Sequence, residues 1–249
     1  MNFLAIIPAR YASTRFPGKP LAIVNGKPMI QRVYEQALKT FKHVCIATDS
    51  PIIVSAVKEF GGKVVLTGEH NSGTDRCLEA YKAYSKSVNI KFDTIINVQG
   101  DEPYIKPEQL EQLKECFNED GVKLATLIKK IESKEELYNS NAPKVVIDNN
   151  NYALYFSRSP IPFPRDIELT DEYILYSKHY RHIGLYGYNS ETLEQICKMP
   201  QSMLEKTEKL EQLRWLENGL KIKVKETEFT SYAVDTPEDL ENINKNISE

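Results

Sequence analysis

The first 67 residues alternate apolar strands with amphipathic helices, and this order constrains the fold more than any other feature. The predicted strands lie at 3–7, 44–47 and 63–67, and the predicted helices at 28–41 and 51–60. Within both helical segments, apolar residues recur at the spacing of one helix face. Strands that alternate with helices usually pair in parallel, so the pattern predicts an α/β fold with helices on both faces of a sheet.

The pattern changes after a further predicted strand at 124–128. Apolar residues flanking Asn149-Asn150-Asn151 predict a β-hairpin over 144–158. The polar stretch 166–178 is predicted to be a mobile loop, and 204–218 a single helix with one buried face. The second half of the chain is therefore predicted to contain a β-rich segment followed by more helices.

A basic loop follows the first predicted strand. It contains Arg10, Arg15 and Lys19, with the hydroxyls of Ser13 and Thr14 among them. Several cations and hydrogen-bond donors in one loop suit a polyphosphate. Ligands of open α/β sheets bind at the carboxyl ends of strands, which is where this loop lies. The alternative is a solvated basic loop, and the clustering of these residues disfavours it.

Acidic residues follow two other strand ends. Asp101 and Glu102 lie three and four residues after the buried strand predicted at 94–98. Mg²⁺ prefers one or two carboxylates plus phosphate oxygens, although Gly-Asp and Glu-Pro pairs also suit a turn. Asp235 lies just outside a helix predicted to begin at Pro237, so helix initiation does not explain it. Beside the basic loop, Asp101 and Asp235 are candidate metal ligands.

Two further segments leave two interpretations open. Ser72, Thr74 and Arg76 begin a predicted helix, whose free amides suit an anion, but either hydroxyl can equally be an N-cap. Arg158 and His182 lie in the β-rich segment among tyrosines. That mixture suits an anionic sugar, but the residues alone favour tyrosines packed at a subunit interface with the cations in solvent.

Composition and the absence of certain motifs disfavour several other classes of protein. The net charge of −3 disfavours a nucleic-acid binder with a broad basic face. The sequence has no apolar run of roughly 20 residues, and its N-terminus lacks the features of a signal peptide, which predicts a cytoplasmic protein. The four cysteines are widely spaced and are expected to be reduced. Walker A and dinucleotide-binding glycine motifs are absent from the sequence.

The basic loop, from Pro8 to Leu21, resembles the nucleotide-binding signature of the 3-deoxy-manno-octulosonate (Kdo) cytidylyltransferase family. Seven further segments resemble the same family in the same order. They are 47–49, 72–76, 97–103, 153–158, 181–188, 210–214 and 234–240. Each segment is weak alone, but the ordered set covers nearly the whole chain and is highly specific.

The resemblance implies an enzyme that converts CTP and Kdo into CMP-Kdo and pyrophosphate for lipopolysaccharide synthesis. It implies a Rossmann-like nucleotidyltransferase fold with a mixed, mostly parallel sheet, in a single domain over 1–249. Residues from about 1 to 135 would bind CTP. A β-rich insertion at about 140–190 would form the sugar site and the dimer interface, and about 190–249 would complete the site. The implied assembly is a homodimer, and the implied cofactor is Mg²⁺.

The resemblance also implies a role for each matching residue. CTP would be bound by Arg10, Ser13, Arg15, Lys19, Ser72, Thr74 and Arg76. Mg²⁺ would be bound by Asp101 and Asp235, and Kdo by Gln99, Arg158, His182, Tyr186 and Glu211. The catalytic residues would be Lys19, Arg15, Asp101 and Asp235.

Two departures from the family pattern are visible. The family usually has proline in an Asn-Pro-Asn triplet before the hairpin, whereas this chain has Pro143 a few residues later, and Asp75 replaces a glutamate. The alternatives are a synthetase for a related acid sugar, 8-amino-Kdo or sialic acid, or a non-catalytic nucleotide-binding regulator. The presence of both Asp101 and Asp235 speaks against the regulator.

Overall fold

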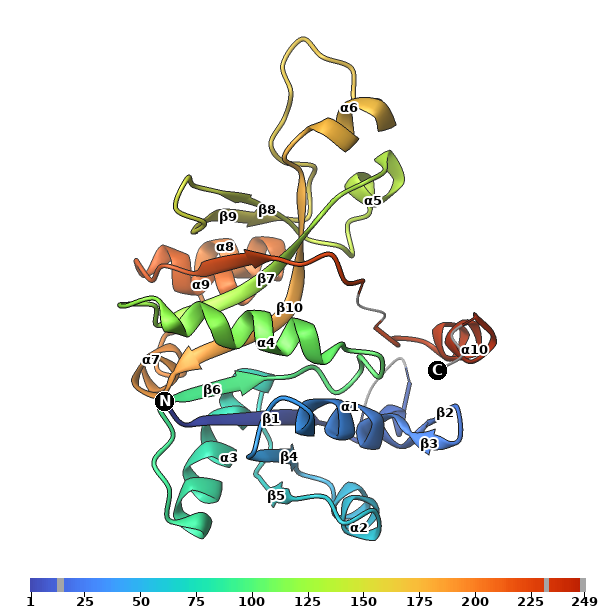
Figure 1. Cartoon of the computed structure of the whole chain (residues 1–249), viewed down its shortest axis with the longest axis vertical. Coiled ribbons are helices and arrows are strands. Elements are labelled where there is room, and N and C mark those ends of the chain that lie inside the picture. Colours follow the sequence, from blue (N-terminus) through green and yellow to red (C-terminus); the bar gives the residue numbers. More distant parts are fainter. Residues whose placement is uncertain (13–15, 231–232, 247–249) are drawn as a thin grey trace. The chain divides into compact units, whose positions relative to one another are not determined.

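The computed structural model describes residues 1–12, 16–230 and 233–246 of the chain (Figure 1). The chain divides into two compact units. Unit 1 comprises residues 1–111, 187–197 and 231–249, and unit 2 comprises residues 112–186 and 198–230. Each unit is therefore assembled from segments that are far apart in the sequence.

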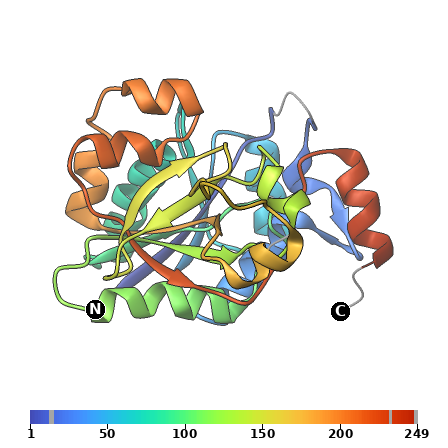
Figure 2. The ribbon, with the colours of Figure 1, turned by 90° about the horizontal axis from the view of Figure 1, so that it is seen from above.

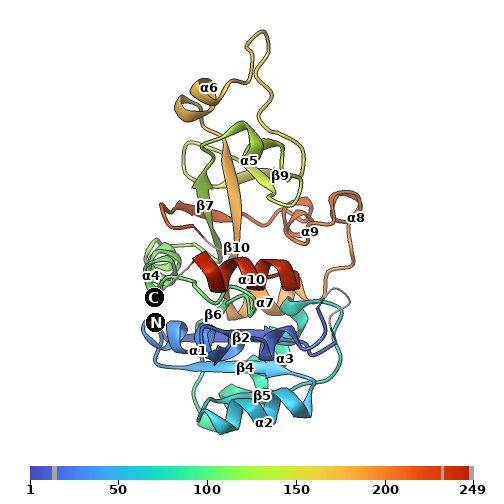
Figure 3. The same ribbon diagram turned by 90° about the vertical axis from the view of Figure 1, so that its right-hand side faces the viewer.

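Unit 1 is built on a parallel sheet. Strand β1 (Phe3–Ala9) pairs in parallel with β4 (Val44–Thr48) on one side and with β6 (Thr94–Asn97) on the other. Strand β5 (Val64–Leu66) pairs in parallel with β4, and Figure 3 shows β4 and β5 side by side. Residues 4–7 of β1 are fully buried, because helices cover the central strand of the sheet. The predicted β-α-β-α-β order is confirmed.

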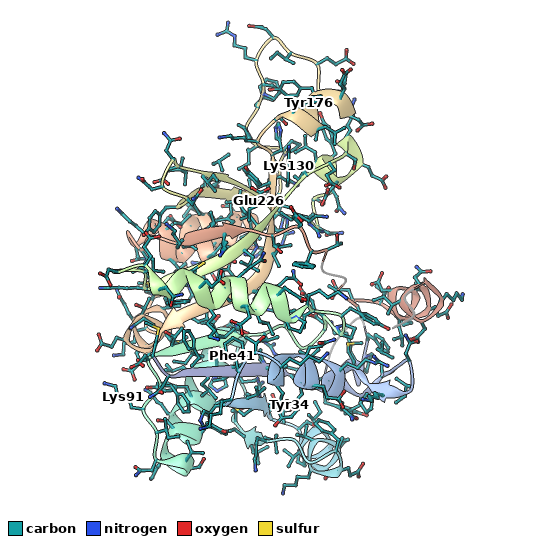
Figure 4. The ribbon with its side chains drawn as sticks, viewed as in Figure 1. Tyr34, Phe41, Lys91, Lys130, Tyr176 and Glu226 are labelled. Carbon is teal, nitrogen blue, oxygen red and sulfur yellow. The ribbon has the colours of Figure 1, made fainter. Side chains whose placement is uncertain are left out.

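Five α-helices of the described residues lie wholly in unit 1, and α1, α2 and α3 connect its strands. The five are α1 (Met29–Leu38), α2 (Pro51–Glu59), α3 (Gly73–Val88), α7 (Ser190–Ile196) and α10 (Pro237–Asn246). Tyr34 of α1, labelled in Figure 4, accepts a hydrogen bond from the Lys63 N–H at 3.1 Å, immediately before β5. This contact holds α1 against the edge of the parallel sheet.

A small hairpin and α10 form a separate corner of unit 1. Strands β2 (Ile23–Val24) and β3 (Lys27–Pro28) pair in antiparallel fashion, and Figure 2 shows α10 beside them. The Asn244 side chain accepts from Asn25 N–H at 3.0 Å and donates to the Ile23 carbonyl at 3.3 Å. The helix that follows Asp235 is thereby fixed to the segment that follows Lys19.

Unit 2 mixes parallel and antiparallel pairing. Strand β7 (Leu124–Lys130) pairs in parallel with β11 (Lys223–Glu226). The predicted hairpin is confirmed as β8 (Lys144–Ile147) and β9 (Ala153–Ser157), and β8 also pairs antiparallel with β10 (Tyr180–Asn189). The last residues of β10, from Gly187, belong to unit 1, as does the first part of α4 (Pro107–Glu115).

Two local predictions in unit 2 are wrong. The segment 204–218 is two helices, α8 (Met203–Glu208) and α9 (Gln212–Glu217), because Lys209 adopts a left-handed conformation with φ of 55°. The polar stretch 166–178 contains α6 (Asp171–Tyr176), which Thr170 caps.

Helix α6 forms because it buries one face. Its Ile174 is fully buried against Leu169, Ile131 and Leu137, the last from α5 (Lys134–Tyr138). On the opposite side Tyr176, labelled in Figure 4, is 84% exposed. A single buried residue among polar neighbours produces no repeating apolar pattern, so the sequence does not indicate this helix.

None of the helices in the described ranges is long and apolar enough to cross a membrane. The cysteines within those ranges are all free thiols, as the sequence predicts.

Candidate functional site

Lys19 is positioned by a tight turn at the end of the basic loop. Gly18 has φ of 73°, a left-handed conformation that glycine adopts without steric cost, and its N–H donates to the Tyr11 carbonyl at 2.9 Å. A short 3₁₀ helix, Lys19–Leu21, begins directly after this turn. Ser13 and Arg15, both predicted to bind CTP, lie outside the described residues, as does Thr14.

Asp101 is positioned by close packing of two strand ends. The loop after β6 begins with a hydrogen bond from Val98 N–H to the Ile6 carbonyl at 2.9 Å. Gly100 lies so close to β1 that a Cβ atom there would be 2.9 Å from the Pro8 carbonyl oxygen. Glycine is therefore required at Gly100, and Asp101 follows it directly.

Asp235 stands at the start of α10 without serving as its cap. The Thr236 hydroxyl accepts from Asp239 N–H at 3.2 Å, and the Asp239 carboxylate accepts from Thr236 N–H at 2.9 Å and Asp235 N–H at 3.0 Å. This reciprocal arrangement satisfies the first backbone donors of the helix. Capping is thus the task of Thr236 and Asp239.

The Lys19 ammonium joins the two predicted metal ligands. Its Nζ atom lies 2.7 Å from Asp101 Oδ2 and 3.3 Å from Asp235 Oδ1. The backbone ties the same segments together, because Val234 N–H donates to the Asp101 carbonyl at 2.9 Å. The lysine side chain is 15% exposed and the two carboxylates 28% and 43%, so the cluster can be reached from solvent. Residues separated by 216 positions in the chain thus form one charged centre.

This centre fits a divalent cation. A single cationic atom already lies within hydrogen-bonding reach of both carboxylates, so Asp101 and Asp235 are close enough to share one ion. Across the residues that are described, no cluster of three or more histidine, cysteine or acidic side chains could hold a metal. Two carboxylates suffice for an ion such as Mg²⁺, whose other ligands are water and phosphate oxygens.

Arg10 connects the end of β1 to the loop before α3. Its Nη2 atom donates to the Asn71 carbonyl at 3.0 Å, and the side chain is otherwise exposed. Ser72 is the N-cap of α3, since its hydroxyl accepts from Asp75 N–H at 3.1 Å. It also donates to the Asp75 carboxylate at 2.7 Å. Both interpretations of this helix start therefore remain compatible. The cap uses one backbone donor of the helix, the Asp75 N–H, and leaves the position beside Arg10 to an anion.

Arg76 is buried beneath this surface. Its Nη2 atom forms an ion pair with Asp49 Oδ2 at 2.6 Å, and its Nη1 atom donates to Thr67 Oγ1 at 2.6 Å and to the Gly68 carbonyl at 3.3 Å. The side chain has no exposed surface. Arg76 thus fastens the ends of β4 and β5 to the first turn of α3. Thr74 is buried as well, at 2% exposure.

Sequence reasoning missed Asp49 and Thr67 as partners of Arg76. Each residue lies just beyond a strand end, Asp49 after β4 and Thr67 after β5. The same signal, a polar residue shortly after a strand end, singled out Asp101.

Arg158 is the centre of a hydrogen-bonded cluster in unit 2. Its guanidinium donates to the carbonyls of Glu208 at 2.7 Å, Ser140 at 2.8 Å and Lys209 at 3.3 Å. The Glu208 carboxylate accepts from Arg158 N–H at 2.9 Å and from the Ser157 hydroxyl at 2.6 Å. The guanidinium thus donates to backbone carbonyls, while the Glu208 carboxylate accepts from the backbone N–H of the same arginine.

The fully buried Lys144 lies near this cluster. Its ammonium donates to the Asn139 carbonyl at 2.8 Å, and burial, with a smaller contribution from Arg158, lowers the pKa of the lysine.

His182 is held as a neutral ring. Its Nε2 atom lies 3.0 Å from Thr126 Oγ1, and that hydroxyl has the carbonyls of Ile183 and Leu185 as acceptors at 3.0 and 2.8 Å. Since the hydroxyl hydrogen is directed to a carbonyl, His182 Nε2 must be the donor to Thr126. Burial of the ring lowers the pKa of His182 to about 3, although the residue as a whole is partly exposed.

Aromatic rings explain why burial dominates at His182. Its ring centroid lies 5.1 Å from those of Phe156 and Tyr186, and Tyr186 meets Trp215 edge-on at 5.0 Å. In the same unit Glu211 accepts from Arg214 Nη2 at 2.8 Å. Unit 2 therefore contains Arg158, His182, Tyr186 and Glu211, whereas Gln99 belongs to unit 1.

Comparison with known proteins gives consistent results. The family model described as "Cytidylyltransferase" matches residues 4–222. A 3-deoxy-manno-octulosonate cytidylyltransferase of Parabacteroides distasonis is 54% identical over 97% of this chain and 96% of its own. One of Thermodesulfovibrio yellowstonii is 49% identical over 97% and 96%.

Solved structures agree with these relatives. The structure of a CMP:2-keto-3-deoxy-manno-octonic acid synthetase complexed with CTP superposes with a TM-score of 0.89, at 40% identity over 98% of both chains. A 4-diphosphocytidyl-2C-methyl-D-erythritol synthase from Anaerococcus prevotii, at 14% identity over 98% of this chain and 97% of its own, has a TM-score of 0.61 and shares the fold. The predicted nucleotidyltransferase fold with a mixed, mostly parallel sheet is confirmed.

Proposed function

Since this chain belongs to the cytidylyltransferase family, we propose that it transfers the cytidylyl group of CTP to Kdo and releases pyrophosphate. The names of relatives about half identical over the full chain support this substrate pair, as does the CTP complex of a 40% identical synthetase. The observation that carries the proposal is the contact of Lys19 with both Asp101 and Asp235. It provides a cation and two carboxylates beside the loops that follow β1 and β6, at the edge where an α/β sheet binds its ligand.

The proposed reaction is an in-line displacement at the α-phosphorus of CTP. The anomeric hydroxyl oxygen of Kdo forms the new bond to phosphorus and loses its proton, while the bond to the β-phosphate oxygen breaks and pyrophosphate leaves. Such transfers need positioning and charge stabilisation more than covalent help from the protein. Arg10 and Lys19 supply cationic donors for the phosphates, and Arg15 and Ser13 are assigned the same task from the family resemblance.

Asp101 and Asp235 are proposed to hold Mg²⁺. The bound ion would reduce repulsion between the acid sugar and the phosphates and favour ionisation of the attacking hydroxyl. Lys19 can turn from the carboxylates to a phosphate oxygen once another cation neutralises Asp101 and Asp235. Its long flexible side chain suits this exchange, and its charge then opposes the charge that builds on the leaving pyrophosphate.

Ser72, Thr74 and Arg76 are assigned to the CTP site with different tasks. Ser72 lies at the partly exposed start of α3, beside the carbonyl that holds Arg10. Thr74 and Arg76 are buried, so we propose that they hold the backbone around the CTP site in place and do not contact the nucleotide.

The sugar-binding residues are proposed from the resemblance and from their surroundings. Arg158 carries a guanidinium, a group that suits the carboxylate of Kdo. A neutral His182 suits hydroxyl groups, and Gln99, Tyr186 and Glu211 are assigned to the same substrate. The proposal further includes a homodimer with the 140–190 insertion at the sugar site and the interface. It places the enzyme in the cytoplasm, with its product entering lipopolysaccharide synthesis.

Pyrophosphate release from CTP and Kdo, with and without Mg²⁺, tests this function. We expect release only when both substrates and the metal are present. A panel of Kdo, 8-amino-Kdo and N-acetylneuraminate identifies the acceptor, and preference for another acid sugar would replace Kdo in the proposal. Absence of release with every sugar, while CTP still binds, would indicate a nucleotide-binding regulator instead.

A further inference from the structure

The loop 67–72, between β5 and α3, is held by a carboxylate that the proposed reaction does not use. The Glu79 side chain, from the second turn of α3, accepts from Gly68 N–H at 3.2 and 3.1 Å through its two oxygens. Its Oε2 atom also lies 2.5 Å from His70 Nε2. One carboxylate therefore binds the loop at two points, on both sides of residue 69.

Helix α3 holds the same loop at a third point. Arg76 is three residues before Glu79, so both side chains lie on the same side of the helix. The Arg76 guanidinium donates to the Gly68 carbonyl and to Thr67 Oγ1, and it is itself fixed by Asp49. The peptide groups on both sides of Gly68 are thus bonded to α3, the N–H to Glu79 and the carbonyl to Arg76.

This loop ends at the group that orients Arg10. Asn71, whose carbonyl accepts from Arg10 Nη2 at 3.0 Å, directly follows His70 in the chain. A continuous path of contacts therefore leads from Glu79 through His70 and the Asn71 peptide to Arg10. Because His70 and Asn71 are joined by a peptide bond, a displacement of His70 also displaces Asn71. The hydrogen bond from Arg10 to the Asn71 carbonyl is then distorted.

We propose that Glu79 and His70 are positioning residues for Arg10, and through it for the triphosphate of CTP. This inference rests on the proposed function, which assigns Arg10 to the phosphates. Neither side chain has to touch the nucleotide. The pair keeps Arg10 oriented before the substrate binds. Ordering of the Arg10 side chain therefore does not reduce the affinity for CTP.

Exposure separates this role from a purely structural one. The side chain of Glu79 is 43% exposed and that of His70 is 23% exposed. Contacts made by partly exposed side chains contribute little to the stability of a fold, so loss of the Glu79 carboxylate should barely change the melting temperature. An effect on CTP without an effect on stability therefore identifies positioning.

Steady-state kinetics of the full-length protein test the inference with Glu79→Ala, Glu79→Gln, Arg10→Ala and the double variant Arg10→Ala/Glu79→Ala. We expect Glu79→Ala to raise the KM for CTP about three- to tenfold with little change in kcat, as for loss of one oriented hydrogen bond. Glu79→Gln retains an acceptor oxygen and should fall between Glu79→Ala and the unmodified enzyme. In the Arg10→Ala background, Glu79→Ala should cause no further increase.

A control variant, Glu35→Ala, and the Arg10 variants distinguish the positioning role of Glu79 from the phosphate role of Arg10. Glu35 is 40% exposed, pairs with Lys27 at 2.7 Å and lies away from this loop on α1, so Glu35→Ala should leave the KM for CTP unchanged. An unchanged KM in Glu79→Ala, or equal increases with and without Arg10, overturns the positioning role alone. If Arg10→Ala leaves the KM for CTP unchanged, the phosphate role of Arg10 is wrong, and the positioning inference is overturned with it.

Discussion

Replacing Gly100 by alanine perturbs the packing that places Asp101 beside Lys19. The added Cβ would lie 2.9 Å from the Pro8 carbonyl oxygen, 3.3 Å from Ile30 Cδ1 and 3.5 Å from Ile7 Cγ2. The shortest of these contacts is to the backbone of the central strand, so a side-chain rotation cannot relieve it. Either β1 or the loop after β6 must move.

The expected cost follows from this geometry. Overpacking of a rigid, buried site typically lowers the free energy of unfolding by about 1–3 kcal/mol. At about 2–4 °C per kcal/mol for a protein of this size, the melting temperature should fall by roughly 2–12 °C. Because Asp101 follows Gly100 directly, kcat should also fall at least about tenfold, since small displacements of catalytic groups are costly.

Gly73→Ala is the matched control, because Gly73 also faces Pro8. Its added Cβ would meet Pro8 Cγ at 3.4 Å, an ordinary contact, in the first turn of α3, where alanine favours the helix. Thermal unfolding followed by circular dichroism, together with pyrophosphate release, measures both effects. If Gly100→Ala melts and turns over like the Gly73→Ala control, close packing at Pro8 does not require glycine at this position.

Three further substitutions test other parts of the account. Lys19→Ala should weaken CTP binding by about ten- to a hundredfold in calorimetry, because a charged donor to phosphate is lost, and unchanged affinity would remove its phosphate role. Arg76→Met should lower the free energy of unfolding by about 3 kcal/mol in urea, since it strips Asp49 of a buried partner, and Arg76→Met/Asp49→Asn should recover part of the loss; a cost no larger than that of a surface substitution would contradict this. Unfolded His182 gains a proton as the pH falls below 6.5, whereas folded His182 does not until about pH 3. The free energy of unfolding should therefore decrease as the pH is lowered from 6.5 to 3, by up to about 1.4 kcal/mol per pH unit. His182→Gln should lose this contribution to the pH dependence of stability.

The charged centre could be anticipated from the sequence because each of its residues follows a recognisable boundary. Lys19 and Asp101 lie beyond buried strands, and parallel strands bring their carboxyl ends to one edge. Asp235 stood out because it lies just outside the helix predicted to begin at Pro237, so that helix initiation does not explain it. The distances of 2.7 and 3.3 Å confirm that the three side chains meet.

Other features depend on contacts that no local pattern encodes. The burial of Arg76 follows from Asp49 and Thr67, which come from the ends of two different strands. The break between α8 and α9 depends on the left-handed conformation of Lys209, a residue type that does not normally mark a helix end. Helix α6 forms around one buried position, Ile174. In each case tertiary packing overrides a weak local preference.

We propose that Asp101 and Asp235 hold the metal for cytidylyl transfer. Pyrophosphate release and CTP affinity, compared among Asp101→Asn, Asp235→Asn and the unmodified enzyme, test this role. We expect each substitution to lower kcat at least about a hundredfold while CTP still binds in calorimetry, because Arg10 and Lys19 remain. Turnover close to that of the unmodified enzyme in either variant would show that its carboxylate does not hold the metal.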